Sequence, residues 1–374
     1  MTEREVRKME ENGKNYEKNF TKSMKKVTLK DIADEAGVSI SCVTRCVNGS
    51  GYVSKEKREK VCQVMERMHY IPNQQAKVLR GGSSRLLGHV HAVADENIFF
   101  TKMAVTIERK SFEKGYKTIT YALDTGDVKM LEGILLDLIS YGVDGIIINA
   151  GIDKEITEEI GRKAKKLSVP LVMIERPADV YEIEKILVDN GEGSYTAVRR
   201  LYNAGHRRIA YLGVVQEEIV EQERYHGYLQ AMKGIDEEYA IKNSYFVEEY
   251  TVENGYKGCL EILDKRTGEE QPTAIFAASD ILAAGVYRAL MERKIQIPED
   301  ISVVGYDDTI AKFLSPPLST MQLPVEEIAE AAVNALINKL EEKEQHSGNR
   351  TVKIGPVFIE RNSIKNIKSP ESLK

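Results

Sequence analysis

Three side chains on one predicted helix are suited to reading the edges of DNA bases. Ile40 can contact the methyl group of a thymine, and Ser41 can donate or accept a hydrogen bond. Arg45, on the same helix, can bind a guanine through two hydrogen bonds or neutralise a phosphate. An apolar residue at an exposed helix start is less well explained by packing within the protein. We therefore expect this helix to contact nucleic acid.

Hydroxyl and amide side chains near the helix ends could hydrogen bond to DNA phosphates. Three of them, at Thr28, Ser39 and Ser54, are equally suited to capping helices, and capping requires no DNA. Both interpretations remain open at these positions. The candidate phosphate contacts are Thr28, Ser39, Asn48, Tyr52 and Ser54.

A pair of short helices between Val27 and Asn48 would position these residues. Thr28 can cap the first helix, and Gly37 can adopt the left-handed conformation that ends it. Ser39 can then cap the second helix. Two short helices joined by a tight turn with glycine are typical of a helix-turn-helix, although such pairs also occur in ordinary bundles. The apolar faces of the two helices contain Ile32, Ala33, Ala36, Val43 and Val47.

Two further helices are predicted after this pair. Ser54 is expected to cap a helix from Lys55 to His69, and Pro72 prevents its continuation. Asn73 can cap a very short helix that ends at Gly81 and Gly82. Since isolated helices of this length are unstable in water, it must fold against the protein or a partner.

Charge is distributed unevenly along the 374 residues, although the net charge is only −5. Residues 25–85 contain 12 Lys and Arg against 6 Asp and Glu, whereas residues 86–374 contain 35 against 47. A basic segment on an acidic body is typical of a DNA-binding domain joined to a separate sensor. A charge run can also be only a solvated surface.

The composition argues against a membrane or secreted protein. No apolar run approaches 18 residues, and the charged N-terminus lacks the apolar core of a signal peptide, so a cytoplasmic location is expected. The four cysteines include no CxxC pair and are expected to be reduced. A zinc or redox site of Cys42, Cys46 and His69 is the alternative, but we predict no metal and no cofactor.

From Leu86 onward, short apolar runs alternate with amphipathic helices in two series, which predicts an α/β fold of two doubly wound parallel-sheet lobes. Ligand sites in such lobes lie at the carboxyl ends of strands. The predicted organisation is a disordered extension (1–24), a helix-turn-helix headpiece (25–71), a hinge (72–84), a bilobed sensor (85–363) and a flexible tail (364–374). Lobe 1 is expected at about 85–188 and 320–345, and lobe 2 at about 189–319 and 346–363.

The motifs VTLKDIADEAGVS, RCVN, VSKEKREKV and YIPNQQAKVL resemble the headpiece of the lactose-repressor (LacI/GalR) family. The resemblance runs from about Val27 to Ile359, in the family's order and spacing. It implies a sensor like a periplasmic sugar-binding protein and adds Asn73, Ala76 and Leu79 to the DNA-binding residues. Leu79 stands where the family inserts a wedge into the minor groove.

The same resemblance implies an effector site. Arg224 matches the family's arginine clamp, and Asp307 matches an aspartate that accepts sugar hydroxyls. We expect the two on opposite walls of a cleft, each needing a hydroxylated ligand as a partner. Ser279 replaces a usual asparagine, and one of two phenylalanines could stack on a sugar. The expected effector residues are Phe99, Phe100, Arg176, Arg224, Ser279 and Asp307.

Three functions are compatible with these features to different degrees. The resemblance implies a homodimeric transcriptional regulator, most often a repressor, that binds a pseudo-palindromic operator and responds to a sugar or sugar phosphate. A sugar-transport receptor would leave the headpiece unexplained. A sugar-modifying enzyme fused to a DNA-binding module would need a catalytic dyad or nucleotide loop, and the sequence has no GxGxxG after a strand, no GxxxxGK[ST] and no HExxH.

Overall fold

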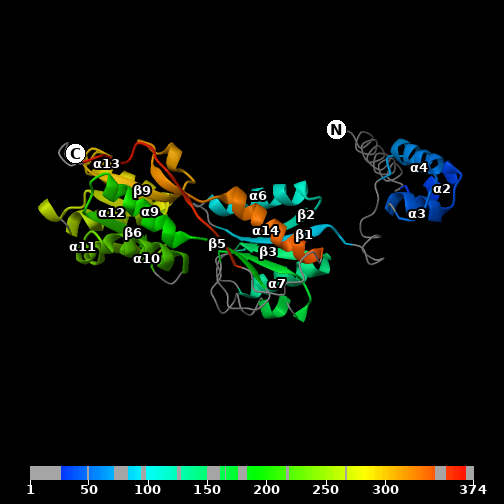
Figure 1. Ribbon diagram of the computed structural model, residues 1–374, viewed down its shortest axis with the longest axis horizontal. Coiled ribbons are helices and arrows are strands. Elements are labelled where there is room, and N and C mark those ends of the chain that lie inside the picture. Colours follow the sequence, from blue (N-terminus) through cyan, green and yellow to red (C-terminus); the bar gives the residue numbers. More distant parts are fainter. Residues whose placement is uncertain are drawn as a thin grey trace, which may run out of the picture. The chain divides into compact units, whose positions relative to one another are not determined.

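The protein is described here from a computed structural model, and its chain divides into two compact units, residues 1–82 and 83–374 (Figure 1). The predicted extension, the helix containing Asn73, Ala76 and Leu79, and Arg176 lie outside the described residues. No helix in the described part is long and apolar enough to cross a membrane. The structure describes residues 27–48, 50–70, 83–93, 98–123, 128–149, 161–164, 166–175, 183–215, 219–265, 268–341 and 351–367.

The described part of the first unit contains three short helices, α2 (Leu29–Ala36), α3 (Ile40–Asn48) and α4 (Lys55–Arg67). Thr28 and Asp31 form a reciprocal capping box at the start of α2, and Gly37 ends it with a φ of 63°. These features confirm the predicted helix boundaries. Apolar residues from all three helices form one small core, which contains Ile32, Ala33, Ala36, Val43, Val61 and Val64.

Two details of the third helix differ from the prediction. The side chain of Ser54 makes no capping hydrogen bond, although its carbonyl accepts one from Arg58. The helix ends at Arg67 rather than His69, because His69 has a φ of 49° and the backbone has already left the helical conformation.

In the second unit, the first lobe is a six-stranded sheet with the order β11-β5-β4-β3-β1-β2. Helices α6 (Phe99–Glu113) and α14 (Val325–Leu340) lie on one side of this sheet, and α7 (Val128–Ser140) lies on the other (Figure 1). All five strand pairings are parallel. The strands are β1 (Leu86–Ala92), β2 (Lys117–Leu123), β3 (Gly145–Asn149), β4 (Leu171–Ile174), β5 (Glu184–Val188) and β11 (Thr351–Ile354).

The second lobe has a sheet of the order β12-β10-β9-β8-β6-β7, in which only the β10–β12 pairing is antiparallel. Its strands are β6 (Ile209–Val214), β7 (Ser244–Val247), β8 (Ala274–Ala277), β9 (Ser302–Asp307), β10 (Ser319–Gln322) and β12 (Val357–Ile359). Its helices are α9 (Asn190–Asn203), α10 (Ile219–Lys233), α11 (Glu237–Lys242), α12 (Val252–Lys265) and α13 (Asp280–Glu292), with short 3-10 turns at Gly268–Glu270 and Ala311–Phe313. The predicted α/β class and two-lobed architecture are confirmed.

Two lobe boundaries and one strand predicted near the C-terminus are wrong. Residues 319–322 pair with β9 in the second sheet, although lobe 1 was expected to resume at about 320. Residues 351–354 pair with β5 in the first sheet, although they were assigned to lobe 2. The single last strand expected from Val352 to Ile359 is two strands, because Gly355 and Pro356 separate them and proline cannot donate to a sheet ladder.

The tail predicted as flexible from residue 364 is held at its start. The Lys365 amide donates to Ser302 Oγ at 2.9 Å, and the Ile367 amide donates to the Ala204 carbonyl at 2.7 Å. The Lys365 carbonyl accepts from His206 Nε2 at 3.1 Å. His206 therefore helps to hold the start of the tail against the second lobe.

Candidate functional site

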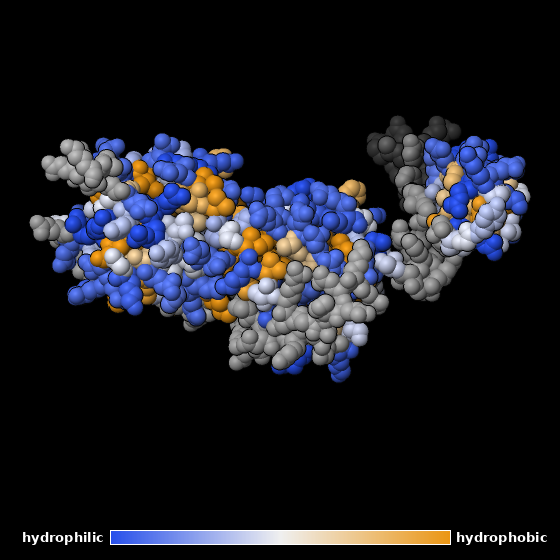
Figure 2. All heavy atoms as spheres, viewed as in Figure 1, coloured by the Kyte–Doolittle hydropathy of each residue, from blue (hydrophilic) through white to orange (hydrophobic). Residues whose placement is uncertain are grey.

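The start of α3 leaves its candidate base-reading residues accessible. The Ile40 side chain is 48% exposed, and Ser41 and Arg45 are also exposed. The Arg45 stem runs beside Gly51, where an added Cβ would lie 3.3 Å from Arg45 Cδ. The visible surface of this unit is mainly hydrophilic (Figure 2). These features suit contact with a polar partner.

The hydroxyl groups at the helix ends fall into two groups. Thr28 exchanges hydrogen bonds with Asp31, and Ser39 Oγ accepts from the Cys42 amide at 3.3 Å, so both cap helices. Ser54 makes no such bond, and Tyr52 is 88% exposed. The latter two hydroxyls are thus the freer candidates for phosphate contact. The side chain of Asn48 lies outside the described residues.

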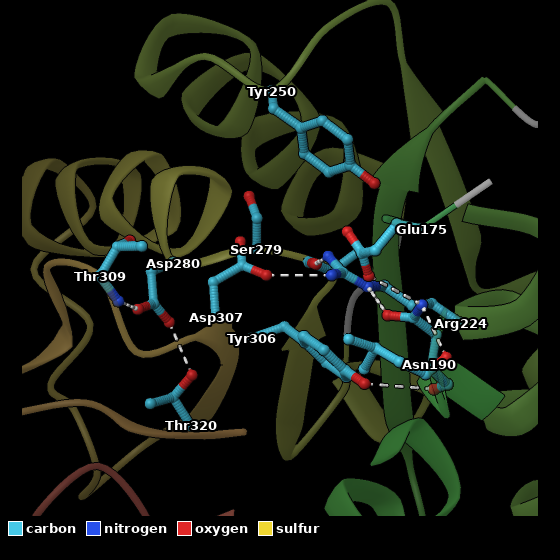
Figure 3. A network of polar contacts seen from close by, with 12 residues as sticks. Glu175, Asn190, Arg224, Tyr250, Ser279, Asp280, Tyr306, Asp307, Thr309 and Thr320 are labelled. Carbon is cyan, nitrogen blue, oxygen red and sulfur yellow. Dashed lines mark hydrogen bonds and ion pairs between the residues drawn. The ribbon is translucent and has the colours of Figure 1, made fainter. Parts of the chain in front are cut away.

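In the second lobe, Arg224 on α10 is the centre of a buried network (Figure 3). Its Nε donates to Asn190 Oδ1 at 3.1 Å, its Nη1 to the Ala278 carbonyl at 2.6 Å, and its Nη2 to Asp307 Oδ1 at 3.0 Å. The guanidinium also lies 3.9 Å from the centre of the Tyr306 ring. Burial lowers the pKa of Arg224, but the combined attraction of Asp307, Tyr250, Tyr306 and Glu175 outweighs it and the pKa is raised.

Asp307, the last residue of β9, is held in an unusual backbone conformation. Its φ is 102° and that of Asp308 is 56°, two adjacent residues in the left-handed region that side chains disfavour. Burial raises the pKa of Asp307 to about 6, although Arg224 partly offsets this effect. The Asp308 carboxylate in turn pairs with Arg361 at 2.7 Å and accepts from Gln322 at 2.7 Å. The turn thus aims one carboxylate at Arg224 and anchors the other.

Residues from both lobes meet around Arg224. Glu175 follows β4 of the first lobe with a φ of 57°, and its Oε1 accepts from Asn190 Nδ2 at 3.5 Å. The Tyr306 hydroxyl donates to the Asn190 carbonyl at 3.3 Å. Asn149, the last residue of β3, is buried, and its amide nitrogen has no hydrogen-bond partner in the described structure. The ends of β3, β4 and β9 thus provide acceptors and one free donor.

A second buried carboxylate lies beside this network. Asp280 Oδ2 accepts from the Thr309 amide at 2.7 Å and Oδ1 from Thr320 Oγ1 at 2.6 Å (Figure 3). Burial, with repulsion from Asp307, raises the pKa of Asp280 to about 7. A third carboxylate, Glu221, accepts from Tyr211 and from the Tyr250 hydroxyl. The region therefore holds several carboxylates around one buried arginine.

One expectation for the effector site needs correction. Arg224 and Asp307 lie in the second lobe, as expected, but pair directly, so they do not face each other unpaired across a cleft. Ser279 uses its hydroxyl to cap α13 by accepting from the Leu282 amide at 3.2 Å. Phe99 is 4% exposed and belongs to the apolar core, whereas Phe100 is half-buried beside it. Of the predicted set, Arg224 and Asp307 are thus the two brought together.

The residues that sequence reasoning missed are Asn149, Glu221, Tyr250, Asp280 and Tyr306. Asn149 and Tyr306 were detectable, because each is a polar or aromatic residue at the carboxyl end of an apolar strand. Glu221 offered no such signal, since a glutamate on an amphipathic helix is usually solvated. For metals, the described residues contain no group of three or more His, Cys, Asp and Glu that could hold an ion.

Two family models match the chain. Residues 28–73 match the model described as bacterial regulatory proteins, lacI family, and residues 198–364 match a periplasmic binding protein-like domain. The two matches cover the helix-turn-helix and most of the second lobe.

Similar proteins span nearly the whole chain. The ribose operon repressor of Haemophilus influenzae is 33% identical over 91% of this chain and 99% of its own length. Catabolite control protein A of Priestia megaterium is 31% identical over 83% of this chain and 91% of its own. A lac repressor dimer, solved with operator and the anti-inducer ONPF, superposes with a TM-score of 0.79 at 26% identity, covering 91% of this chain and 100% of that one.

Proposed function

Because the chain belongs to the lacI family of bacterial regulatory proteins, we propose that it is a repressor whose affinity for operator DNA is set by a neutral sugar. It is a DNA-binding transcriptional regulator with an effector-binding sensor. Its place of action is then the bacterial cytoplasm, and its function requires no catalysis. The proposal concerns the chemistry of the effector, the sign of regulation and the assembly.

The choice of effector rests on the hydrogen bonds that Arg224 already makes within the protein. The guanidinium already donates to Asp307, Asn190 and a carbonyl, so little of its charge is available to a second anion. Glu175 and Glu221 add negative charge nearby. A phosphate would be repelled by these carboxylates, whereas sugar hydroxyls can donate to them and accept from the Asn149 amide. We therefore favour a neutral sugar over the sugar phosphate that the sequence left open.

The DNA-binding half of the proposal rests on the headpiece. Ile40 and Ser41 are exposed at the start of α3, and Arg45 is exposed in its last turn. Two copies related by two-fold symmetry would present two such helices to a pseudo-palindromic operator, as in the lac repressor dimer bound to operator. Leu79 is proposed to insert into the minor groove, on the basis of the family resemblance alone.

The test begins with DNA selected from a random library by the purified protein, because no operator is assumed. The selected DNA is labelled, and its binding is followed by fluorescence anisotropy while sugars are added. D-ribose comes first, because of the ribose operon repressor, followed by other pentoses and hexoses and the phosphate ester of each. We expect a free sugar to shift DNA affinity and its phosphate ester to have no effect.

Asp307→Asn is the matched variant, since it keeps the size of the side chain and removes its charge. It should select the same DNA but lose the response to sugar. Failure to enrich any DNA would refute the proposal that the protein binds an operator. If DNA is enriched but its binding responds only to phosphate esters, the effector is not a neutral sugar. The proposal that an effector controls DNA binding would still hold.

A further inference from the structure

Two histidines on β1 lie in a position that the proposed function does not use. His89 and His91 are two residues apart on one strand, so their side chains point to the same face of the sheet. Their ring centres are 5.6 Å apart, with an interplanar angle of 31°. A Cβ added at Gly88 would meet Leu138 of α7 at 2.8 Å, which places both histidines on the opposite face, the one covered by α6 and α14.

The hydrogen bonding of the two rings is incomplete. His89 is 1% exposed, and neither of its ring nitrogens has a partner in the described structure. Buried polar groups without partners cost free energy, so an apolar residue would be preferred here if nothing bound to the ring. Asn149 on β3 lies opposite His91 in the strand register, and its amide nitrogen is also without a partner. One small region thus contains three unsatisfied buried nitrogen atoms.

His91 is already in the tautomer that a metal requires. Its Nδ1 lies 2.9 Å from the Ala92 carbonyl, which can only accept, so Nδ1 carries the proton. Nε2 is then left with a free lone pair, as in metal-bound histidines whose second nitrogen donates to a carbonyl. His89 is buried and has no partner at either ring nitrogen in the described structure, so its ring offers a second nitrogen ligand.

We propose that His89 and His91 form a chelating pair for a late first-row divalent metal ion such as Ni²⁺, Cu²⁺ or Zn²⁺. Neutral imidazoles are preferred ligands of these ions, with metal–nitrogen distances of about 2.0–2.1 Å for zinc. The described residues offer no third His, Cys, Asp or Glu, so water or the Asn149 amide oxygen completes the coordination. His91 is only partly buried and provides the side from which an ion enters.

The test is a titration of the full-length, reduced protein with Ni²⁺ by isothermal titration calorimetry. His89→Val and His91→Thr each remove one ligand and suit a strand. His226→Gln is the control, because His226 is an exposed histidine on α10 outside the pair. We expect the wild type and the control to bind one Ni²⁺ more than either β1 variant, or to bind that ion at least tenfold more tightly. Equal binding by all four proteins would overturn the proposal.

Thermal unfolding separates lost ligands from lost folding. His89→Val removes two unsatisfied nitrogens and should be at least as stable as the wild type without metal. Ni²⁺ should raise the unfolding temperature of the wild type and the His226→Gln control but not of the β1 variants, since a ligand stabilises only the state that binds it. An equal Ni²⁺-dependent shift in the β1 variants would show that the ion binds to other groups. If Ni²⁺ shifted the unfolding temperature of none of the proteins, the proposed metal site would be refuted.

Discussion

The candidate functional side chains are exposed in the headpiece but buried in the second lobe of the sensor. In the headpiece, the side chains of Ile40, Ser41 and Arg45 are exposed. In the second lobe, Arg224 and Asp307 are each 5% exposed and bonded to each other. A functional residue in the headpiece can therefore change without altering the fold, whereas one in the lobe belongs to the fold and to the site at once.

The largest expected effect tests this contrast in stability. Arg224→Met should lower the free energy of unfolding of the sensor by about 3–5 kcal/mol, because it leaves Asp307 and Asn190 without their buried partner. Arg45→Met in the headpiece should change stability by less than about 0.5 kcal/mol. Urea denaturation followed by circular dichroism measures both. Equal losses of unfolding free energy in the two variants would show that Arg224 contributes no more to stability than Arg45 does.

A loss of effector response in an Arg224 variant could therefore have two causes, a lost ligand contact or a weakened fold. An arginine that only clamped a ligand could be removed while DNA binding stayed intact. Since Arg224 is also a structural partner of three groups, the truncated variant can lose the response through a weakened fold. Asp307→Asn is the better probe of the site, because its amide oxygen can still accept from Arg224 Nη2.

DNA binding should show the reverse pattern. Arg45→Ala is expected to weaken binding to the selected DNA by about 1–3 kcal/mol if the guanidinium reads a base, with no change in unfolding. Anisotropy with selected and random DNA at fixed salt measures the difference. A loss of equal size on both DNAs would assign Arg45 to phosphate contact instead.

The sequence predicted the headpiece more accurately than the contacts within the second lobe. The first two headpiece helices depend on contacts between residues a few positions apart, such as the cap at Thr28, and both helices were correctly predicted. The pairing of Arg224 with Asp307 spans 83 positions, and no local pattern encodes it. The resemblance identified both residues but not that they touch.

The lobe boundaries failed for a related reason. Whether a short segment such as 319–322 or 351–354 joins one sheet or the other depends on which strand edge is free. This is a property of the assembled fold. Periodicity shows that a strand exists without indicating its neighbour.

The buried carboxylates should make the stability of the sensor depend on pH. The pKa of Asp280 is raised to about 7, above its value in the unfolded chain, so the folded state holds its proton more tightly. The resulting stabilisation is present at low pH and is lost as pH rises through about 7. Between pH 6 and pH 8 the loss should be about 1 kcal/mol.

Asp280→Asn should flatten this dependence, because the amide does not titrate. Unfolding curves at pH 6, 7 and 8 for the wild type and the variant provide the measurement. The prediction fails if the wild type becomes more stable as pH rises from 6 to 8, or if the variant keeps the same slope.

The smallest effect concerns two hydroxyls of the headpiece that look alike in the sequence. Thr28 and Ser54 both precede a helix, but only Thr28 makes a capping hydrogen bond. Thr28→Ala should therefore cost about 1 kcal/mol of headpiece stability, and Ser54→Ala should cost nearly nothing. Their effects on DNA binding should differ in the opposite sense, since the uncommitted Ser54 hydroxyl is the one available to a phosphate. Thermal unfolding and anisotropy on the same two variants would show whether a helix-end hydroxyl can cap and bind DNA at once. If Thr28→Ala weakened DNA binding beyond its loss of folded protein, capping and phosphate contact would not be alternatives at this position.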